Sequence, residues 1–270
     1  MAKYSKRKAL GQHFLTNPGI LRKITAVIAP EKNDTIIEIG PGKGALTLHL
    51  TEKAGCVIAV EKDPSLIPFL RTLSRSNLVV INADFLSVNL HELMDNPPVK
   101  VVGNLPYSIS TQIIMKILEN HRLFTSCVFL LQKEVAERIC AFPHSKKYAP
   151  LSILLKNYFK RKIHFSVPPG SFIPPPEVHS SLISLTKKDQ PDFIIQNDHV
   201  FLEFLHVCFR HRRKKLINNL KEAGLDLSLI IKVLKDNDID EKVRAEDLTL
   251  AEYIDLFNVW ARRSPLKNPT

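Results

Sequence analysis

The stretch TIIEI-GPGKG-ALTLHLTEK, residues 35–53, decides the fold. Its first five residues form a short apolar run rich in β-branched residues, which predicts a strand. The glycines at 40–44 predict a tight turn, and the apolar period of the last segment predicts a helix. A strand, a glycine turn and a helix in this order are typical of a doubly wound α/β sheet, where glycines let an adenine-containing cofactor approach the backbone.

Further apolar runs alternate with segments of helical period along the next hundred residues. Strands are predicted at 56–61, 78–82, 100–104 and 126–132, with a later candidate at 180–186. Helices are expected after Asp63, from Ser110 or Thr111, and over KEVAERICA, residues 133–141. Strands that alternate with helices predict βαβ units, and therefore an α/β fold whose parallel sheet has helices on both faces.

The character of the sequence changes near Lys187. The segment DQPDFIIQND, residues 189–198, reads as a linker, and the apolar segments beyond it have helical period only. We therefore predict one domain at 1–189 and a small all-helical domain at 190–270.

The chain carries 38 Lys and Arg against 27 Asp and Glu, which gives a net charge of +11. The basic residues gather before Glu31, at 156–162 and at 210–215. A basic surface gains free energy by releasing counterions from phosphates, so the charge favours a polyanionic partner. Three clusters fit an extended nucleic acid better than a small acidic metabolite, although charge alone leaves a merely solvated surface open.

Cysteine spacing and hydropathy exclude several other classes of protein. The four cysteines show no CxxC pair and no metal-ligand spacing, so we expect reduced thiols and no metal. No apolar run has membrane-spanning length, and the N-terminus lacks the apolar core of a signal peptide. We therefore expect a cytoplasmic protein with no membrane partner. We also expect a monomer.

Two acidic residues follow further strands where a nucleoside cofactor would need them. Glu61 ends the strand at 56–61. In nucleoside-binding sheets, an acid at this position accepts both hydroxyls of the ribose. Asp84 follows the strand at 78–82 and can accept the adenine amine. Ordinary loop acids are the alternative for both. Because Gly40-x-Gly42-x-x-Ala45 also satisfies the dinucleotide pattern, the turn alone does not separate a nicotinamide dinucleotide from S-adenosylmethionine.

The tetrapeptide Asn104-Leu105-Pro106-Tyr107 closes the fourth strand and favours methyl transfer. The fourth strand is expected beside the first, so its end faces the cofactor. The Asn104 oxygen and a carbonyl of Leu105 or Pro106 would accept the hydrogens of adenine's exocyclic amine and aim its lone pair at a sulfonium methyl. Tyr107 offers a ring on which a base turned out of its helix can stack. Catalysis would then be positioning and electrostatics.

With these motifs, the chain resembles the ribosomal RNA adenine dimethyltransferases, the KsgA/Dim family. The likeness runs from GQHFL (11–15) to RAEDLTLAEYIDLFN (244–258) and includes EIGPGKGALT, NADFL, VVGNLPYSIST and FRHRRKKLINNL. It implies a Rossmann-like class I methyltransferase sheet with a small C-terminal all-helical, RNA-binding domain. The implied activity uses S-adenosylmethionine to dimethylate the N6 amines of two adjacent adenosines near the 3′ end of small-subunit (16S) rRNA, in the 30S particle, during ribosome biogenesis.

The resemblance also implies roles for single residues. The catalytic positions correspond to Asn104, Tyr107 and Phe172, with Phe172 sandwiching the target base against Tyr107. A core phenylalanine is the alternative for Phe172. The basic cluster at 210–215 and the basic N-terminus would hold rRNA phosphates. His13 stands where many bacterial members have Asn, which leaves its side-chain role open. The positions that would bind the cofactor are His13, Leu15, Gly40, Glu61, Asp84 and Asn104.

Three other functions stay open at this point. A large-subunit rRNA adenine methyltransferase would share the NLPY turn, although the segments RRKKLINNL and RAEDLTLAEY favour the small-subunit branch. A non-catalytic rRNA-binding assembly factor would be expected to lose the cofactor residues, which stand intact here. A nicotinamide-dependent oxidoreductase would leave the NLPY turn and the basic clusters unexplained.

Overall fold

The computed structural model of the chain describes residues 13–94 and 97–261, which group into two compact units. The described residues up to Ala136 and the stretch Lys160–Lys187 form the first unit. Glu137–Phe159 and the described residues from Lys188 onward form the second. The domain boundary predicted at 189/190 stays a prediction, because packing does not test where an independently folding domain ends.

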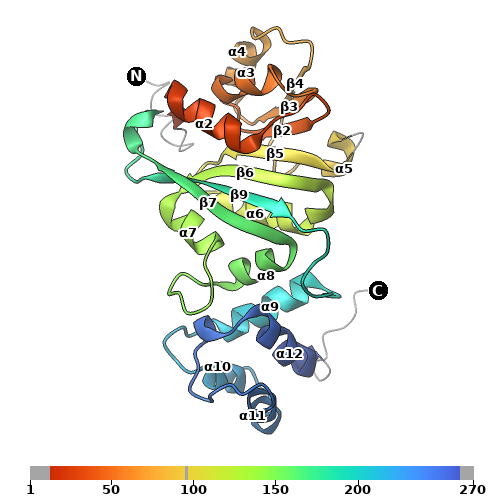
Figure 1. Cartoon of the computed structure of the whole chain (residues 1–270), viewed down its shortest axis with the longest axis vertical. Coiled ribbons are helices and arrows are strands. Elements are labelled where there is room, and N and C mark those ends of the chain that lie inside the picture. Colours follow the sequence, from red (N-terminus) through yellow and green to blue (C-terminus); the bar gives the residue numbers. More distant parts are fainter. Residues whose placement is uncertain (1–12, 95–96, 262–270) are drawn as a thin grey trace. The chain divides into compact units, whose positions relative to one another are not determined.

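The first unit is built on a seven-stranded sheet of order β4-β3-β2-β5-β6-β9-β7 (Figure 1). The strands from β4 to β6 run parallel, and β9 is antiparallel to β6. The predicted α/β fold is thereby confirmed, including the neighbouring positions of the first and fourth predicted strands, β2 and β5. The strands are β2 (Thr35–Ile39), β3 (Cys56–Glu61), β4 (Leu78–Asn82), β5 (Val99–Asn104), β6 (Phe124–Gln132), β7 (Phe159–Val167) and β9 (Ser180–Lys187).

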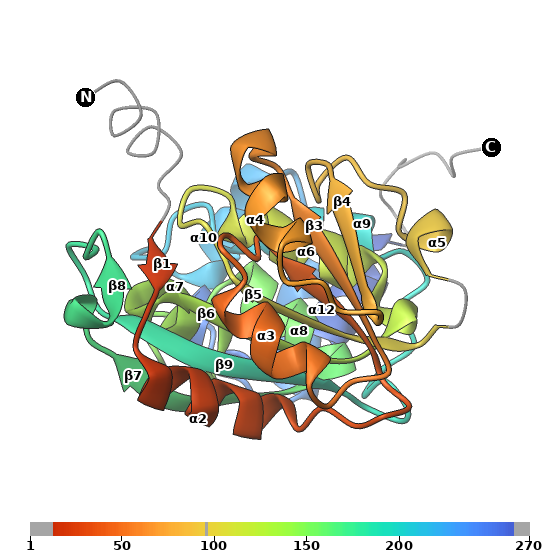
Figure 2. The same ribbon diagram turned by 90° about the horizontal axis from the view of Figure 1, so that it is seen from above.

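Along the sequence, helices of this unit alternate with its strands. Helices α2 and α3 pack against one another, as Figure 2 shows. Asn17 begins α2 by accepting a hydrogen bond from the Ile20 N–H, and Pro18 occupies the first turn, where its missing N–H costs nothing. The helical segments are α2 (Pro18–Ile28), α3 (Ala45–Thr51), η1 (Pro64–Leu66), α4 (Ile67–Arg71), α5 (Leu90–Leu93), α6 (Ser110–Glu119), η2 (His121–Leu123), η3 (Pro169–Ser171) and α7 (Lys133–Ile139), which continues into the second unit.

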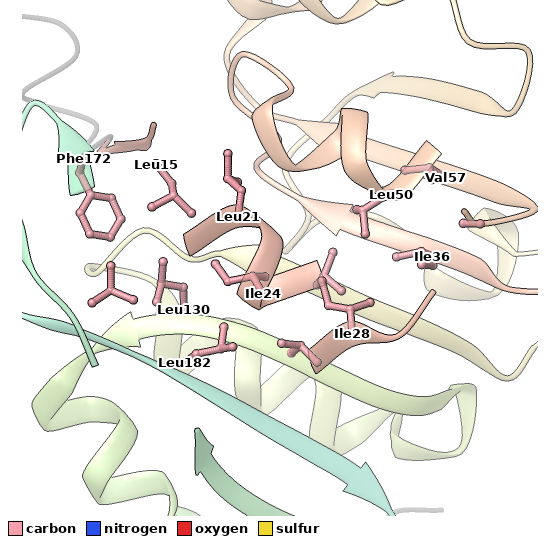
Figure 3. Packing of buried hydrophobic residues seen from close by; sticks show 14 residues of the cluster. Leu15, Leu21, Ile24, Ile28, Ile36, Leu50, Val57, Leu130, Phe172 and Leu182 are labelled. Atoms are coloured by element: carbon pink, nitrogen blue, oxygen red, sulfur yellow. The ribbon is translucent and has the colours of Figure 1, made fainter. Parts of the chain in front are cut away.

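The core of the first unit forms between the sheet and the apolar face of α2 (Figure 3). Leu21, Ile24 and Ile28 recur at helical spacing and are buried against side chains of the strands. Neighbouring residues of β2, Ile36 and Ile37, point to opposite faces of the sheet, and both are fully buried. The sheet is therefore covered on both faces, as parallel sheets are. Each such side chain contributes roughly 1.5–3 kcal/mol.

A short antiparallel ribbon joins β1 (Phe14–Leu15) to β8 (Phe172–Ile173). Phe14 pairs with Ile173 and Leu15 with Phe172, and Figure 2 shows the two segments side by side. The Thr16 N–H adds a bond of 2.9 Å to the Ser171 carbonyl. The ribbon thus fixes the position of His13, the first described residue.

The second unit contains helices only in its described part beyond Lys187, as predicted. The second unit contains a cluster of aromatic rings. The ring centroid of Phe257 lies 5.0 Å from that of Phe201 and 5.7 Å from that of Trp260. No helix among the described residues is long and apolar enough to cross a membrane. The helical segments are α8 (Pro150–Tyr158), α9 (Asp198–Cys208), α10 (Leu216–Glu222), α11 (Leu227–Asp236), η4 (Ala245–Asp247) and α12 (Leu250–Ala261).

Candidate cofactor and active site

A cavity of about 1130 Å³ lies at the carboxyl ends of β2, β3 and β5. Its volume exceeds the roughly 300–1,000 Å³ typical of sites for one small molecule. Phe172 is absent from the lining. Seven of the eight site residues predicted from the sequence line this cavity: His13, Leu15, Gly40, Glu61, Asp84, Asn104 and Tyr107.

The glycine turn opens one wall of the cavity. Gly40 and Gly42 have φ angles of +64° and +61°, a left-handed conformation that favours glycine. The space into which a Cβ on Gly40 would project is open. A Cβ on Gly42, in contrast, would lie 2.9 Å from the Phe14 ring. The turn therefore leaves room for a ligand beside Gly40 and lets the β1 segment cover Gly42 closely.

Both carboxylate oxygens of Glu61 accept backbone N–H groups, and one of these belongs to the glycine turn. Its Oε2 accepts the Gly42 N–H at 3.0 Å, and its Oε1 accepts the Asp63 N–H at 2.8 Å. Burial raises the pKa of Glu61, and these two N–H groups partly offset that rise. A carboxylate has about four lone-pair positions, so acceptor capacity remains for hydroxyl donors in the cavity.

Asp84 is an ionised acceptor at the end of β4. Its Oδ2 lies 2.7 Å from the Lys62 ammonium, and its Oδ1 accepts the Leu86 N–H at 3.0 Å. The hydrogen bond from Lys62 is the main reason that the pKa of Asp84 lies below its ordinary value. The side chain is thus fixed in place and charged at neutral pH.

Asn104, the last residue of β5, has its amide oriented by the first described residue. Its Nδ2 donates to the His13 carbonyl at 2.7 Å. This contact leaves Oδ1 to accept a hydrogen bond from a ligand. The following turn is held by two backbone bonds, from the Leu105 N–H to Leu130 and from the Ile109 N–H to Pro106. The acceptor therefore stands on a rigid support.

Tyr107 is fixed at both its hydroxyl and its ring. The hydroxyl lies 2.9 Å from the Ser180 Oγ, and the ring is stacked on His13 with centroids 5.5 Å apart. The His13 Nδ1 is in turn 2.8 Å from the Pro174 carbonyl. His13 thus touches both residues of the NLPY turn that were predicted to be catalytic. The sequence had left the role of this side chain open.

Phe172 lies in the hydrophobic core and does not line the cavity. It is 2% exposed and packs with Leu15, Leu130 and Leu182 (Figure 3). This position matches the core alternative, and His13, not Phe172, faces the Tyr107 ring. A sandwich of a base between Tyr107 and Phe172 stays a prediction, and it would require the ribbon of β1 and β8 to rearrange.

Glu38 is a cavity residue that the sequence reasoning did not select. It is 2% exposed, lines the cavity, and accepts a hydrogen bond of 2.6 Å from the Thr47 hydroxyl. Burial raises the pKa of Glu38 to about 7. The available signal was the carboxylate within the apolar run TIIEI, because a buried acid is costly and is retained mainly where it has a function.

Replacing Glu38 with glutamine is expected to change how stability depends on pH. The folded-state pKa of about 7 lies above the ordinary 4.5, so folding stability falls as the pH rises through this window. At about 1.4 kcal/mol per pKa unit, the loss is about 3 to 4 kcal/mol. In urea unfolding without cofactor, the stability of Glu38→Gln relative to wild type should grow by that amount from about pH 4.5 to about pH 8. A pH-independent difference would contradict the raised pKa.

The strand order and the cavity at the glycine turn define a Rossmann-like class I methyltransferase domain. The model of the family "Ribosomal RNA adenine dimethylase" matches residues 3–262, so the chain belongs to this family.

Sequence similarity to known proteins extends over nearly the whole chain. Ribosomal RNA small subunit methyltransferase A of Alkaliphilus oremlandii (strain OhILAs) is 42% identical over 264 residues, covering 95% of this chain and 92% of the relative. The protein of the same name from Clostridioides difficile (strain 630) is 40% identical, covering 93% and 90%.

Two solved structures are also similar. A dimethyladenosine transferase from Plasmodium falciparum has a TM-score of 0.80 at 28% identity, covering 93% of this chain and 98% of that one. The 23S rRNA methyltransferase ErmE has a TM-score of 0.72 at 22% identity, covering 91% and 98%, which shows the shared fold alone.

Proposed function

We propose that the chain is an S-adenosylmethionine-dependent enzyme that dimethylates the N6 amines of two adjacent adenosines near the 3′ end of small-subunit (16S) rRNA in ribosome biogenesis. The observation that carries the proposal is the Asn104 amide, whose nitrogen is held by the His13 carbonyl while its oxygen is left to accept. The same cavity holds the glycine turn, Glu61 and Asp84. The names of the bacterial relatives support a small-subunit rRNA substrate.

The residues of the cavity fit S-adenosylmethionine. The open space beside Gly40 can receive the methionine part close to the backbone. Glu61 would accept the ribose hydroxyls and Asp84 the adenine amine, while His13 and Leu15 would cover the bound molecule. When bound, the cofactor supplies an electrophilic methyl group.

The protein contributes positioning to the reaction. The Asn104 Oδ1 would accept one hydrogen of the target amine and turn its lone pair out of conjugation with the ring. Tyr107, fixed by Ser180, would hold the plane of the base at the required angle. A preorganised acceptor costs no reorganisation during the reaction. The proton of the amine can leave after transfer, so no strong general base is required.

Two residues of the basic cluster at 210–215 contact other residues of the second unit through their side chains. Arg212 donates to the carbonyls of Lys146 and Tyr148 and pairs with Glu246, so it braces the second unit. Lys214 is paired with Glu222. We propose that the exposed Arg210, Arg213 and Lys215 hold phosphates of rRNA in the 30S particle.

Of the basic residues before Glu31, those at 3–8 lie outside the described residues, whereas Arg22 and Lys23 are exposed on α2. A monomer acting in the cytoplasm, as expected from the sequence, completes the proposal.

A labelled methyl group should test the activity and the substrate together. We expect the protein to transfer methyl from S-adenosylmethionine into under-methylated 30S particles, with dimethyladenosine found by mass spectrometry. Naked large-subunit RNA should remain unlabelled, and labelling of that RNA instead would favour the large-subunit alternative. Binding of 30S particles without transfer would favour the assembly factor. Calorimetry that showed tighter binding of NAD than of S-adenosylhomocysteine would favour the oxidoreductase.

A further inference from the structure

Lys116 of α6 makes an unusual set of contacts with the loop that follows β4. Its ammonium donates to the carbonyl oxygens of Phe85, Leu86 and Val88 at 2.9, 2.8 and 2.6 Å. An ammonium has three N–H donors, and all three are used on this one loop. The side chain is half-buried, so the contacts are partly shielded from water.

The loop held in this way is the one that carries Asp84. The carbonyl of Asp84 accepts the N–H groups of Ser87 and Val88, while its side chain accepts that of Leu86. These bonds make a compact turn at the end of β4. Since the carbonyls of residues 85, 86 and 88 converge on Lys116, the direction of the Asp84 carboxylate depends on the position of the ammonium.

The same ammonium also contacts the ring of Phe85, which lines the cavity next to Asp84. It lies 5.5 Å from the ring centroid, a cation–π distance. Phe85 is 4% exposed. Burial lowers the pKa of Lys116, while the charge of Asp84 acts against that change. Charge-assisted hydrogen bonds are roughly twice as strong as neutral ones, so removing the charge would release the loop.

We propose that Lys116 is a positioning residue for the adenine of the cofactor, which it orients through the Asp84 carboxylate. This inference rests on the proposed function. It also joins the two halves of the site, because α6 begins at Ser110, shortly after the NLPY turn. Lys116 thereby links the helix that follows the target-base turn to the loop that would receive adenine.

The test uses Lys116→Met, which keeps the length of the side chain and removes its charge and donors. Gln112→Met is the matched control, because Gln112 lies one turn earlier on α6 and is exposed. Calorimetry would measure the binding of S-adenosylhomocysteine and of its analogue that lacks the 6-amino group. Lys116→Met should weaken S-adenosylhomocysteine about tenfold, in keeping with the loss of a charged hydrogen-bond set. The analogue should bind the variant and wild type within about twofold, because it makes no bond to Asp84.

Two further measurements separate positioning from a merely structural role. Lys116→Met should raise the KM for S-adenosylmethionine while kcat at saturation changes little. Lys116→Arg keeps the charge and should recover part of the affinity for S-adenosylhomocysteine. The Arg variant also tests the proposal if the Met variant fails to fold. Unchanged affinity in Lys116→Met, or equal losses for both ligands, would overturn the inference. If wild type itself failed to bind S-adenosylhomocysteine, the proposed function would fall instead.

Discussion

Asn104→Ala is expected to lower kcat for methyl transfer about a thousandfold, in line with the loss of one preorganised polar group from an active site. The physical reason is the loss of the oxygen that would turn the lone pair of the target amine toward the methyl group. The affinity for S-adenosylhomocysteine should stay within a few-fold, because Glu61, Asp84 and the glycine turn are unaffected. Single-turnover transfer into under-methylated 30S particles and calorimetry measure the two effects separately.

An isosteric variant tests the orientation of the amide. Asn104→Asp keeps an acceptor of the same shape, but it cannot donate to the His13 carbonyl as the Asn104 amide does. Two oxygens would then face each other, so the carboxylate should rotate away and activity should again be low. An active Asn104→Ala enzyme would contradict the positioning argument. A large loss of cofactor binding in that variant would mean that Asn104 mainly holds the cofactor.

The fold could be predicted from the sequence because its decisive signals are local. The glycine turn after TIIEI and the alternation of strand and helix follow from backbone sterics and hydrophobic period. The neighbouring positions of β2 and β5 followed from the topology of doubly wound sheets. In contrast, α8 was not predicted, because its run PLSILLKNY is buried on most sides and has weak helical periodicity. Strand β7 was not predicted either, because its charged residues mask the strand pattern.

The site was predictable only where residue type and strand end coincide. Glu61 and Asn104 end a strand, and Asp84 and Tyr107 come shortly after one, so topology alone brings them to one cavity. The hydrogen bonds from Lys116 to the loop at 85–88 depend on how α6 packs. The spacing of residues in the sequence does not reveal that packing. The contact of His13 with Tyr107 depends on the pairing of β1 with β8, segments far apart in the sequence. Interactions of this kind require tertiary structure.

Neutralising Arg210, Arg213 and Lys215 together, each to glutamine, is expected to weaken 30S binding about a hundredfold at about 0.1 M salt. Each lost phosphate contact removes close to one unit from the slope of log K against log salt, so the slope should flatten by about 2 to 3. The fold should be unaffected, because these three side chains are exposed. Arg212 is excluded from the set, because it supports the carbonyls of Lys146 and Tyr148 and its loss would lower stability.

The matched control changes the same charge elsewhere on the second unit. Lys221, Lys232 and Lys235 lie on α10 and α11 and are also exposed. If a general attraction by net charge held the RNA, both triple variants would lose affinity to the same extent, because both remove three positive charges. If the contacts are local, the control should keep the wild-type slope. Equal behaviour of the two variants would therefore remove Arg210, Arg213 and Lys215 from the proposed RNA contact, whatever the loss of affinity.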